Sequence, residues 1–194
     1  MHLMHDLALK VVSHDYLSLR LRSVGSVEIQ SATHHLSIST DDLGKYDAVP
    51  RRRLKSELEE HKTRFKVEDL QTLMLFGEMD EGFFKIFGDF FGEANGLRTL
   101  SLPNMLCPVE SMLYKFSRLV HLRYLSLGTE ETQMHIPLSI SKLYHLRILD
   151  LELWDGRRDL LEDISNLAKL CHFYVPSDDQ LHSDIYNVGK LKLL

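Results

Sequence analysis

Leucines recur in a fixed three-residue pattern along the middle of the chain. The pattern leucine-x-x-leucine-x-leucine occurs three times between Leu97 and Leu151, and the first leucines are 25 and 24 residues apart. Similar apolar triples begin at Leu70 and Leu170. Apolar residues also stand three and six positions before the triples at Leu97, Leu122, Leu146 and Leu170, which is the spacing of a helical turn. Each unit therefore predicts one strand with inward leucines and a short helical or irregular return outside it.

The length of the unit lies within the period of about 20–29 residues that is typical of leucine-rich repeats. One unit cannot bury its own apolar face, so several must stack around a shared core. We therefore predict an α/β leucine-rich-repeat solenoid over residues 63–194, with a curved parallel sheet. The last apolar residues, Leu191 and Leu194, fall short of a full unit. We expect the repeat array to be truncated at that end.

The segment before the repeats predicts a short helix followed by strands. Residues 4–12 place apolar side chains on one face at helical spacing, and Asp6 stands where a carboxylate caps a helix. The runs at 16–19 and 35–38 have strand-like composition. Residues 39–62 then become polar and charged, which indicates a loop and a charged helix.

The residues beside the inward leucines are predicted to form the outer, concave face of the sheet, because side chains alternate along a strand. The position after the first leucine holds Gln71, Arg98, Arg123, Arg147, Cys171 and Lys192. Its three consecutive arginines would stack about 4.8 Å apart, the spacing of neighbouring strands. Two further columns contain Tyr124 and His172, and Asp150 and Tyr174.

Arginine and aromatic residues are enriched at protein-interaction hot spots, so this face is a candidate partner-binding surface. The predicted contact residues are Arg98, Arg123, Tyr124, Arg147, Asp150, His172 and Tyr174. The alternative is a solvated sheet whose arginines pair with Asp150, Glu152 or other carboxylates. Such exposed pairs contribute only about 0–1 kcal/mol each. The sequence leaves both interpretations open.

The composition of the chain limits the classes of protein to which it can belong. With 194 residues, 44% of them apolar, the chain can bury a sizeable core. A net charge of -5 gives no overall attraction to nucleic acid or to anionic membranes, and no apolar run reaches the roughly 18–20 residues of a membrane span. The two cysteines lack disulfide or zinc spacing. We expect a cytoplasmic protein without a nucleic-acid partner or an integral membrane segment.

No catalytic or cofactor chemistry emerges from the sequence. The eleven histidines are scattered, and their closest clusters lack the three or four ligands of a metal site. No nucleophile arrangement or paired carboxylates occur, and no Gly-x-x-x-x-Gly-Lys loop is present to hold phosphates. We expect no metal, no cofactor in this chain alone and no enzymatic activity.

Three stretches resemble plant intracellular immune receptors, in which an NB-ARC nucleotide-binding module precedes leucine-rich repeats. The Met-His-Asp-Leu sequence at residues 4–7 is similar to the motif that closes the NB-ARC module. Residues 33–38 are similar to the strand that opens the repeat domain, and residues 136–151 resemble its commonest repeat. The resemblance implies an NB-ARC edge at 1–24, an opening strand and charged linker at 25–62, and repeats at 63–194.

The resemblance also implies roles for individual residues. In the family, the histidine of the closing motif contacts the phosphate of bound ADP, a role that would fall on His5, with Asp6 positioning the loop. The alternative is that both residues merely begin a helix. The turn position that the family usually fills with Asn or Cys holds Met105, Glu130 and Trp154 here.

The function implied by the resemblance is recognition and autoinhibition in plant defence. The repeats would bind a pathogen effector or a guarded host protein, and would pack against the NB-ARC module, which binds ADP or ATP in the full-length family. The alternative is a stand-alone leucine-rich-repeat scaffold that binds a host signalling protein without a nucleotide switch.

Overall fold

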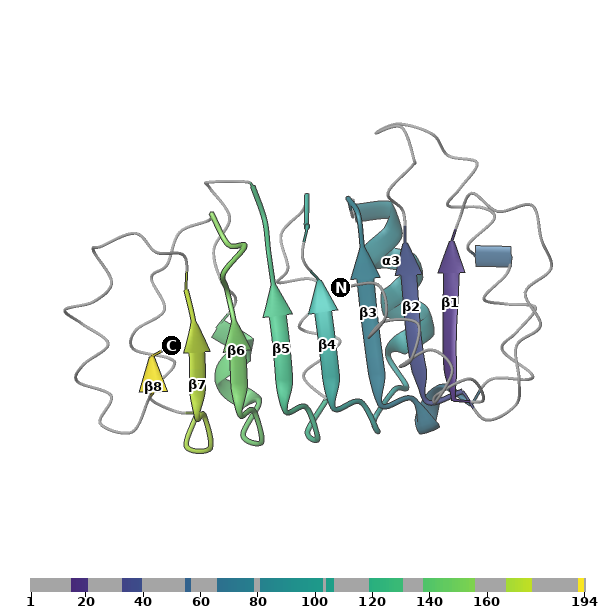
Figure 1. Cartoon of the computed structure of the whole chain (residues 1–194). Coiled ribbons are helices and arrows are strands. Elements are labelled where there is room, and N and C mark those ends of the chain that lie inside the picture. The colour runs from purple at the N-terminus through teal and green to yellow at the C-terminus, as the bar shows by residue number, and fades with distance from the viewer. Residues whose placement is uncertain are drawn as a thin grey trace, which may run out of the picture.

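The computed structural model contains one open, parallel β-sheet that runs through the whole described part of the chain (Figure 1). The structure describes residues 15–20, 33–39, 55–56, 66–78, 81–102, 104–106, 119–130, 138–155, 167–175 and 192–193. The helix predicted at residues 4–12 lies outside these ranges. Of the predicted charged helix, Lys55 and Ser56 are described, and both are helical.

Eight strands lie in the sheet in the order of the chain, and each pairs in parallel with its sequence neighbours. They are β1 (Tyr16–Arg20), β2 (His35–Ser39), β3 (Thr72–Phe76), β4 (Thr99–Leu102), β5 (Tyr124–Leu127), β6 (Ile148–Asp150), β7 (His172–Tyr174) and β8 (Lys192–Leu193). This one-strand-per-unit order confirms the predicted arrangement of the repeats.

Helical segments provide the returns between strands. They are η1 (Val67–Asp69), α3 (Glu81–Phe91) and η2 (Leu138–Lys142). Figure 1 shows α3 behind β2 and β3. Its buried phenylalanines, Phe83, Phe84 and Phe87, belong to the same core as the strand leucines. Among the described residues, no helix is long and apolar enough to cross a membrane.

The core is a stack of the predicted leucines. Leu100, Leu125 and Leu149 are register partners on consecutive strands, and each is 0% exposed. The other members of the three central triples are equally hidden: Leu97, Leu102, Leu122, Leu127, Leu146 and Leu151 are all at most 1% exposed. The interpretation of these leucines as core residues is confirmed.

The sheet begins before the predicted boundary at residue 63. Strands β1 and β2 occupy the predicted strand positions, and β2 pairs in register with β3. Thr33, Leu36 and Ile38 have the spacing of the leucine triple and are all buried. In this predicted opening strand, a buried threonine takes the position of the first leucine.

The turn after β5 differs from the prediction. Met105, Thr129 and Trp154 form a buried column, whereas Glu130 is exposed. Thr129 bridges in parallel to Trp154, and its hydroxyl Oγ1 donates to the Met105 carbonyl at 2.7 Å. Thr129 therefore fills the inward turn position that the sequence assigned to Glu130. The reason is that the turn after Leu127 is one residue shorter than the turn after Leu102.

The register of the last strand also differs. Lys192 pairs with His172 and Leu193 with Phe173, so Lys192 does not join the column of arginines. A shift of one residue exchanges the two faces of a strand. The observed pairing makes Leu193 the register partner of Phe173, and regular repeat spacing did not anticipate it.

We predict that Leu125→Ala lowers the free energy of unfolding by about 2–5 kcal/mol, because it removes a fully buried side chain and leaves a cavity. The matched control is Leu153→Ala, since Leu153 is 61% exposed. The control should change stability by less than about 0.5 kcal/mol. Urea denaturation of the three proteins measures both values, and equal losses for the two variants would contradict the assigned core.

Candidate protein-interaction surface

The residue just before each strand is held by a repeated pair of backbone hydrogen bonds. The Arg98 carbonyl accepts from the N–H groups of Arg123 at 2.8 Å and Tyr124 at 3.0 Å. The same paired bonds join Arg123 to the next repeat, and Arg147 to the one after it. Every repeat thus presents one side chain at the same place on the amino-terminal edge of the sheet.

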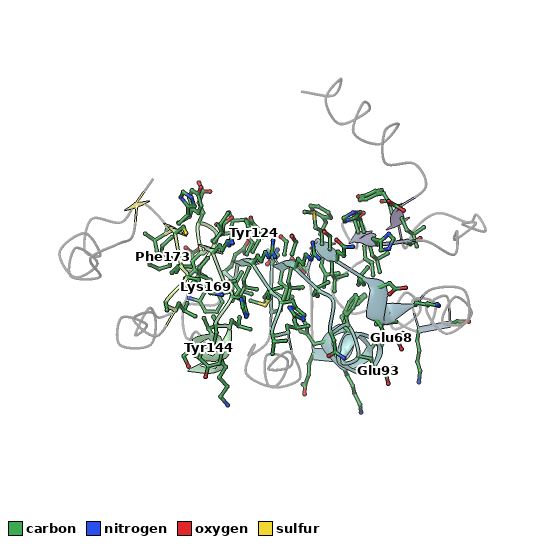
Figure 2. All side chains as sticks on the ribbon, turned by 90° about the horizontal axis from the view of Figure 1, so that it is seen from below. Glu68, Glu93, Tyr124, Tyr144, Lys169 and Phe173 are labelled. Carbon is green, nitrogen blue, oxygen red and sulfur yellow. The ribbon has the colours of Figure 1, made fainter. Side chains whose placement is uncertain are left out.

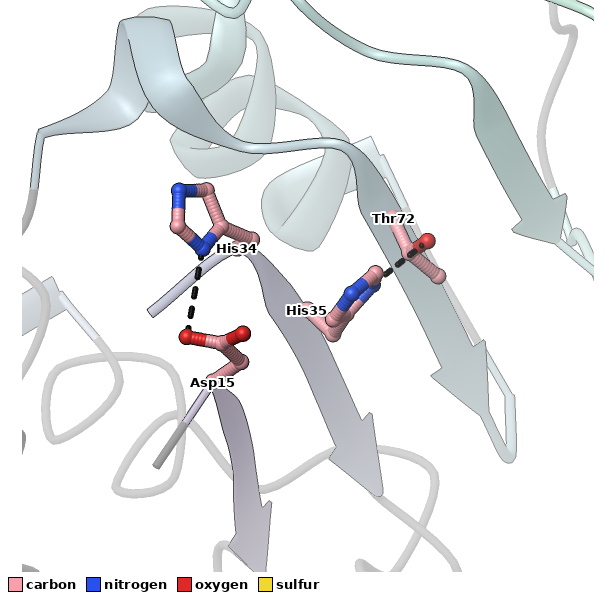
Figure 3. Close-up of polar contacts among 4 residues, drawn as sticks. All are labelled: Asp15, His34, His35 and Thr72. Carbon is pink, nitrogen blue, oxygen red and sulfur yellow. Dashed lines mark hydrogen bonds and ion pairs between the residues drawn. The ribbon is translucent and has the colours of Figure 1, made fainter. Parts of the chain in front are cut away.

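We call this row the edge column. It consists of Asp15, His34, Gln71, Arg98, Arg123, Arg147 and Cys171. The three arginines are exposed, and their predicted adjacency on consecutive repeats is confirmed. At the other end of the column, His34 Nδ1 lies 3.3 Å from Asp15 Oδ1 (Figure 3). Neighbouring members of the column can therefore contact each other directly.

The positive charge of the three arginines is not compensated within the described residues. None of their guanidinium groups has an ion-pair partner there, although Asp150 and Glu152 are both described. The structure therefore shows no pairing of the arginines with these two carboxylates, and the solvated-sheet alternative with pairing to other carboxylates stays open. Arginines about 4.8 Å apart by strand spacing repel each other until an anion lies between or above them.

Two columns of side chains form the face of the sheet opposite the core, which we call the open face. Ser37 and Ser126 are buried there, and most of the other members are half-buried. The first contains Tyr16, His35, Thr72, Thr99, Tyr124, Ile148 and His172. The second contains Ser18, Ser37, Met74, Ser101, Ser126, Asp150 and Tyr174. Figure 2 shows Tyr124 on the side of the sheet opposite Tyr144 and Glu93.

Hydrogen bonds connect neighbouring strands across the open face. The Tyr16 hydroxyl donates to Ser37 Oγ at 2.6 Å, from β1 to β2. Tyr124 on β5 donates in the same way to Asp150 Oδ2 on β6, at 2.9 Å. His35 Nδ1 lies 2.9 Å from Thr72 Oγ1 (Figure 3). These bonds hold polar side chains in place before any partner arrives.

Tyr124 and Asp150 are two predicted contact residues that the structure joins. Burial raises the pKa of the Tyr124 hydroxyl to about 12, and its hydrogen bond to Asp150 and the Asp150 charge act in the same direction. The second Asp150 oxygen accepts from the Glu152 N–H at 3.1 Å. These two hydrogen bonds make Asp150 a fixed acceptor beside the edge column.

The other predicted residues have different environments. His172 and Tyr174 are half-buried on β7, and the buried His172 Nδ1 has no partner in the structure. Whether these residues contact a partner stays a prediction. His5 and Asp6 lie outside the described residues. Among the residues that the structure does describe, no group of three or more His, Cys, Asp or Glu could hold a metal ion.

A second basic row was missed by the sequence analysis. It consists of His121, His145 and Lys169, two positions before the edge column. Lys169 Nζ lies 3.0 Å from His145 Nδ1, and the rings of His121 and His145 are 6.4 Å apart. The pattern was visible in the sequence, because each of these residues directly precedes the first leucine of a triple.

No protein-family model matches the sequence, and no curated protein matches it. Solved structures do match. An internalin, inlF of Listeria monocytogenes, aligns over 92% of this chain with a TM-score of 0.50 and 13% sequence identity. The fold is a leucine-rich-repeat solenoid. The chain spans 46% of the length of that internalin, and so low an identity shows the fold alone.

A second internalin, inlC2 of the same species, aligns with a TM-score of 0.42 and 16% identity over 95% of this chain and 82% of its own. The fold assignment rests on the first of these internalins and does not indicate a partner. What this solenoid binds must be argued from its own surface.

We predict that Tyr124 loses its proton only near pH 12. Its pKa is raised above the ordinary tyrosine value of about 10, so its stabilising contribution is complete below about pH 10 and is lost as the pH rises through about 12. The difference between the ultraviolet titration curves of the wild type and of Tyr124→Phe isolates the titration of this tyrosine. Asp150→Asn should lower the midpoint only in part, because burial remains. A midpoint near pH 10 in wild type would contradict the Tyr124–Asp150 contact.

Proposed function

We propose that this chain is the recognition and autoinhibition region of a plant intracellular immune receptor, and that it binds protein partners through the edge column and the adjoining open face. The observation that carries the proposal is the row of three exposed arginines without an ion-pair partner among the described residues. Such a row is electrostatically unfavourable on its own and becomes favourable when an anionic partner covers it.

The neighbouring side chains suit a protein partner. A guanidinium donates two parallel hydrogen bonds to one carboxylate, which fixes orientation as well as charge. Tyr124 is held by Asp150 at 2.9 Å, so little side-chain entropy is lost when a partner packs on its ring. Three arginines around a fixed tyrosine combine the residue types that dominate interface energetics.

The proposed switch is a shift between two populations. In the resting receptor, the repeats contact the NB-ARC module and stabilise its closed, ADP-bound state. A pathogen effector or an altered host protein that prefers the open state releases this contact. His5 and Asp6 would belong to the nucleotide site, and ADP or ATP would bind the complete cytoplasmic receptor. In this proposal the chain alone needs no cofactor and catalyses no reaction.

A second candidate function is a stand-alone scaffold that binds a host signalling protein. It needs only the surface described above and no role for His5 or Asp6. The two proposals differ in what the gene encodes upstream of Met1. A Gly-x-x-x-x-Gly-Lys phosphate-binding loop in the same reading frame supports the receptor, and its absence supports the scaffold.

We predict that Arg98→Glu/Arg123→Glu/Arg147→Glu, introduced into the complete receptor, changes signalling. The reversed charges should weaken contact with the NB-ARC module or with the recognised protein, and so raise activity without the effector or reduce the response to it. Transient expression in leaves, with cell death scored in both conditions, measures the two effects.

The matched control is Lys66→Glu/Lys85→Glu/Lys142→Glu, which changes the net charge by the same amount. These lysines are exposed and lie at or within the helical segments η1, α3 and η2. The control should behave as wild type. An arginine triple variant that is indistinguishable from wild type in both conditions would remove the edge column from the proposed function.

A further inference from the structure

We propose that the edge column is spaced to bind one α-helix of a partner protein, with carboxylates of that helix at positions i, i+3 or i+4, and i+7. The proposal rests on the proposed function and specifies the chemistry of its partner. It follows from three features of Arg98, Arg123 and Arg147: their spacing, their uncompensated charge and the neutral residues on either side of the row.

The spacing favours a helix over an extended segment. Three consecutive strands separate the outer arginines by about 9.6 Å at their backbones, since neighbouring strands lie about 4.8 Å apart. A helix rises about 10.5 Å over seven residues, and its side chains at i and i+4 are about 5–6 Å apart. An extended segment presents same-side residues about 6.6–7 Å apart, and therefore about 13–14 Å over two intervals. The helix therefore matches the backbone spacing of the three arginines more closely than an extended segment does.

The charge pattern favours acidic side chains in a short row. The arginines lack ion-pair partners among the described residues, while Asp15 already contacts His34 in the same column at 3.3 Å. The positive stretch ends at Gln71 on one side and at Cys171 on the other. This bounded row of three matches three carboxylates.

A nucleic-acid strand is a weaker match than an acidic helix. A polyanion gains affinity from each phosphate that it neutralises, and so favours a long basic track. Here the arginine row stops after three residues, the row beside it holds His121, His145 and Lys169, and the chain as a whole carries a net charge of -5. A short acidic helix matches the arginine row without needing a longer track of cations.

The test uses two synthetic Ala- and Gln-based helical peptides of about 18 residues, long enough to form a helix in water. One peptide carries three glutamates at i, i+4 and i+7, and the other carries the same residues with the glutamates on three different faces. Circular dichroism confirms equal helicity. Fluorescence anisotropy measures binding to the full chain. We expect the one-face peptide to bind about tenfold more tightly, because only it forms all three charge-assisted bonds at once.

Two variants test whether the arginines recognise the peptide. Arg123→Gln gives the centre of the row the residue type that the same column has at Gln71. It should reduce the preference for the one-face peptide to about twofold, because the central arginine no longer binds a carboxylate. The control variant, Lys66→Gln/Lys85→Gln/Lys142→Gln, should keep the full preference. An oligothymidine of matched charge should bind more weakly than the one-face peptide.

Each outcome decides for or against the inference. Equal affinity for the two peptides, an unchanged preference in Arg123→Gln, or tighter binding of the oligothymidine would overturn it. This failure is separable from failure of the proposed function. If the chain binds the two peptides with equal affinity but the arginine triple variant still changes signalling in leaves, the surface works without a helical partner. If the chain prefers the one-face peptide but the arginine triple variant does not change signalling, the edge column binds helices but has no role in the receptor.

Discussion

The in-register parallel pairing of consecutive strands is the constraint on which the rest of this structure depends. It sets Leu100, Leu125 and Leu149 beside one another in the core, fully hidden from solvent. No unit could bury these leucines alone, so each repeat is stable only between its neighbours. The same pairing fixes where every other side chain of the repeat must lie, including residues that contribute nothing to the core.

The edge column is a consequence of that pairing. Paired hydrogen bonds from one repeat to the next hold the backbone at Arg98, Arg123 and Arg147 at equivalent places. The register therefore places three like charges at strand spacing, which is mildly repulsive. The Tyr124–Asp150 hydrogen bond supplies a rigid neighbour to this row.

Much of the fold could be predicted because the spacing of the leucines determines the register of the strands. The prediction was wrong where a turn changed length or where a strand changed register. Thr129 replaced Glu130 as the inward turn residue, and β8 paired one residue away from its expected register. The arginine column was predictable from the same periodicity. The Tyr124–Asp150 bond and the Lys169–His145 contact were not, because they depend on side-chain reach between strands.

The central claim is that strand register, rather than chance proximity, aligns the edge column. Cys171 allows a direct measurement, because it is an exposed free cysteine whose N–H donates to the Arg147 carbonyl at 2.8 Å. In a Cys107→Ser background, oxidation of Arg147→Cys should form a disulfide with Cys171, since neighbouring strands lie within the 4.4–6.8 Å or so that a disulfide spans. Arg123→Cys, two strands away at about 9.6 Å, should stay reduced under the same conditions. A disulfide at position 123 but not at 147, detected by intact-protein mass spectrometry, would contradict the register and the column built on it.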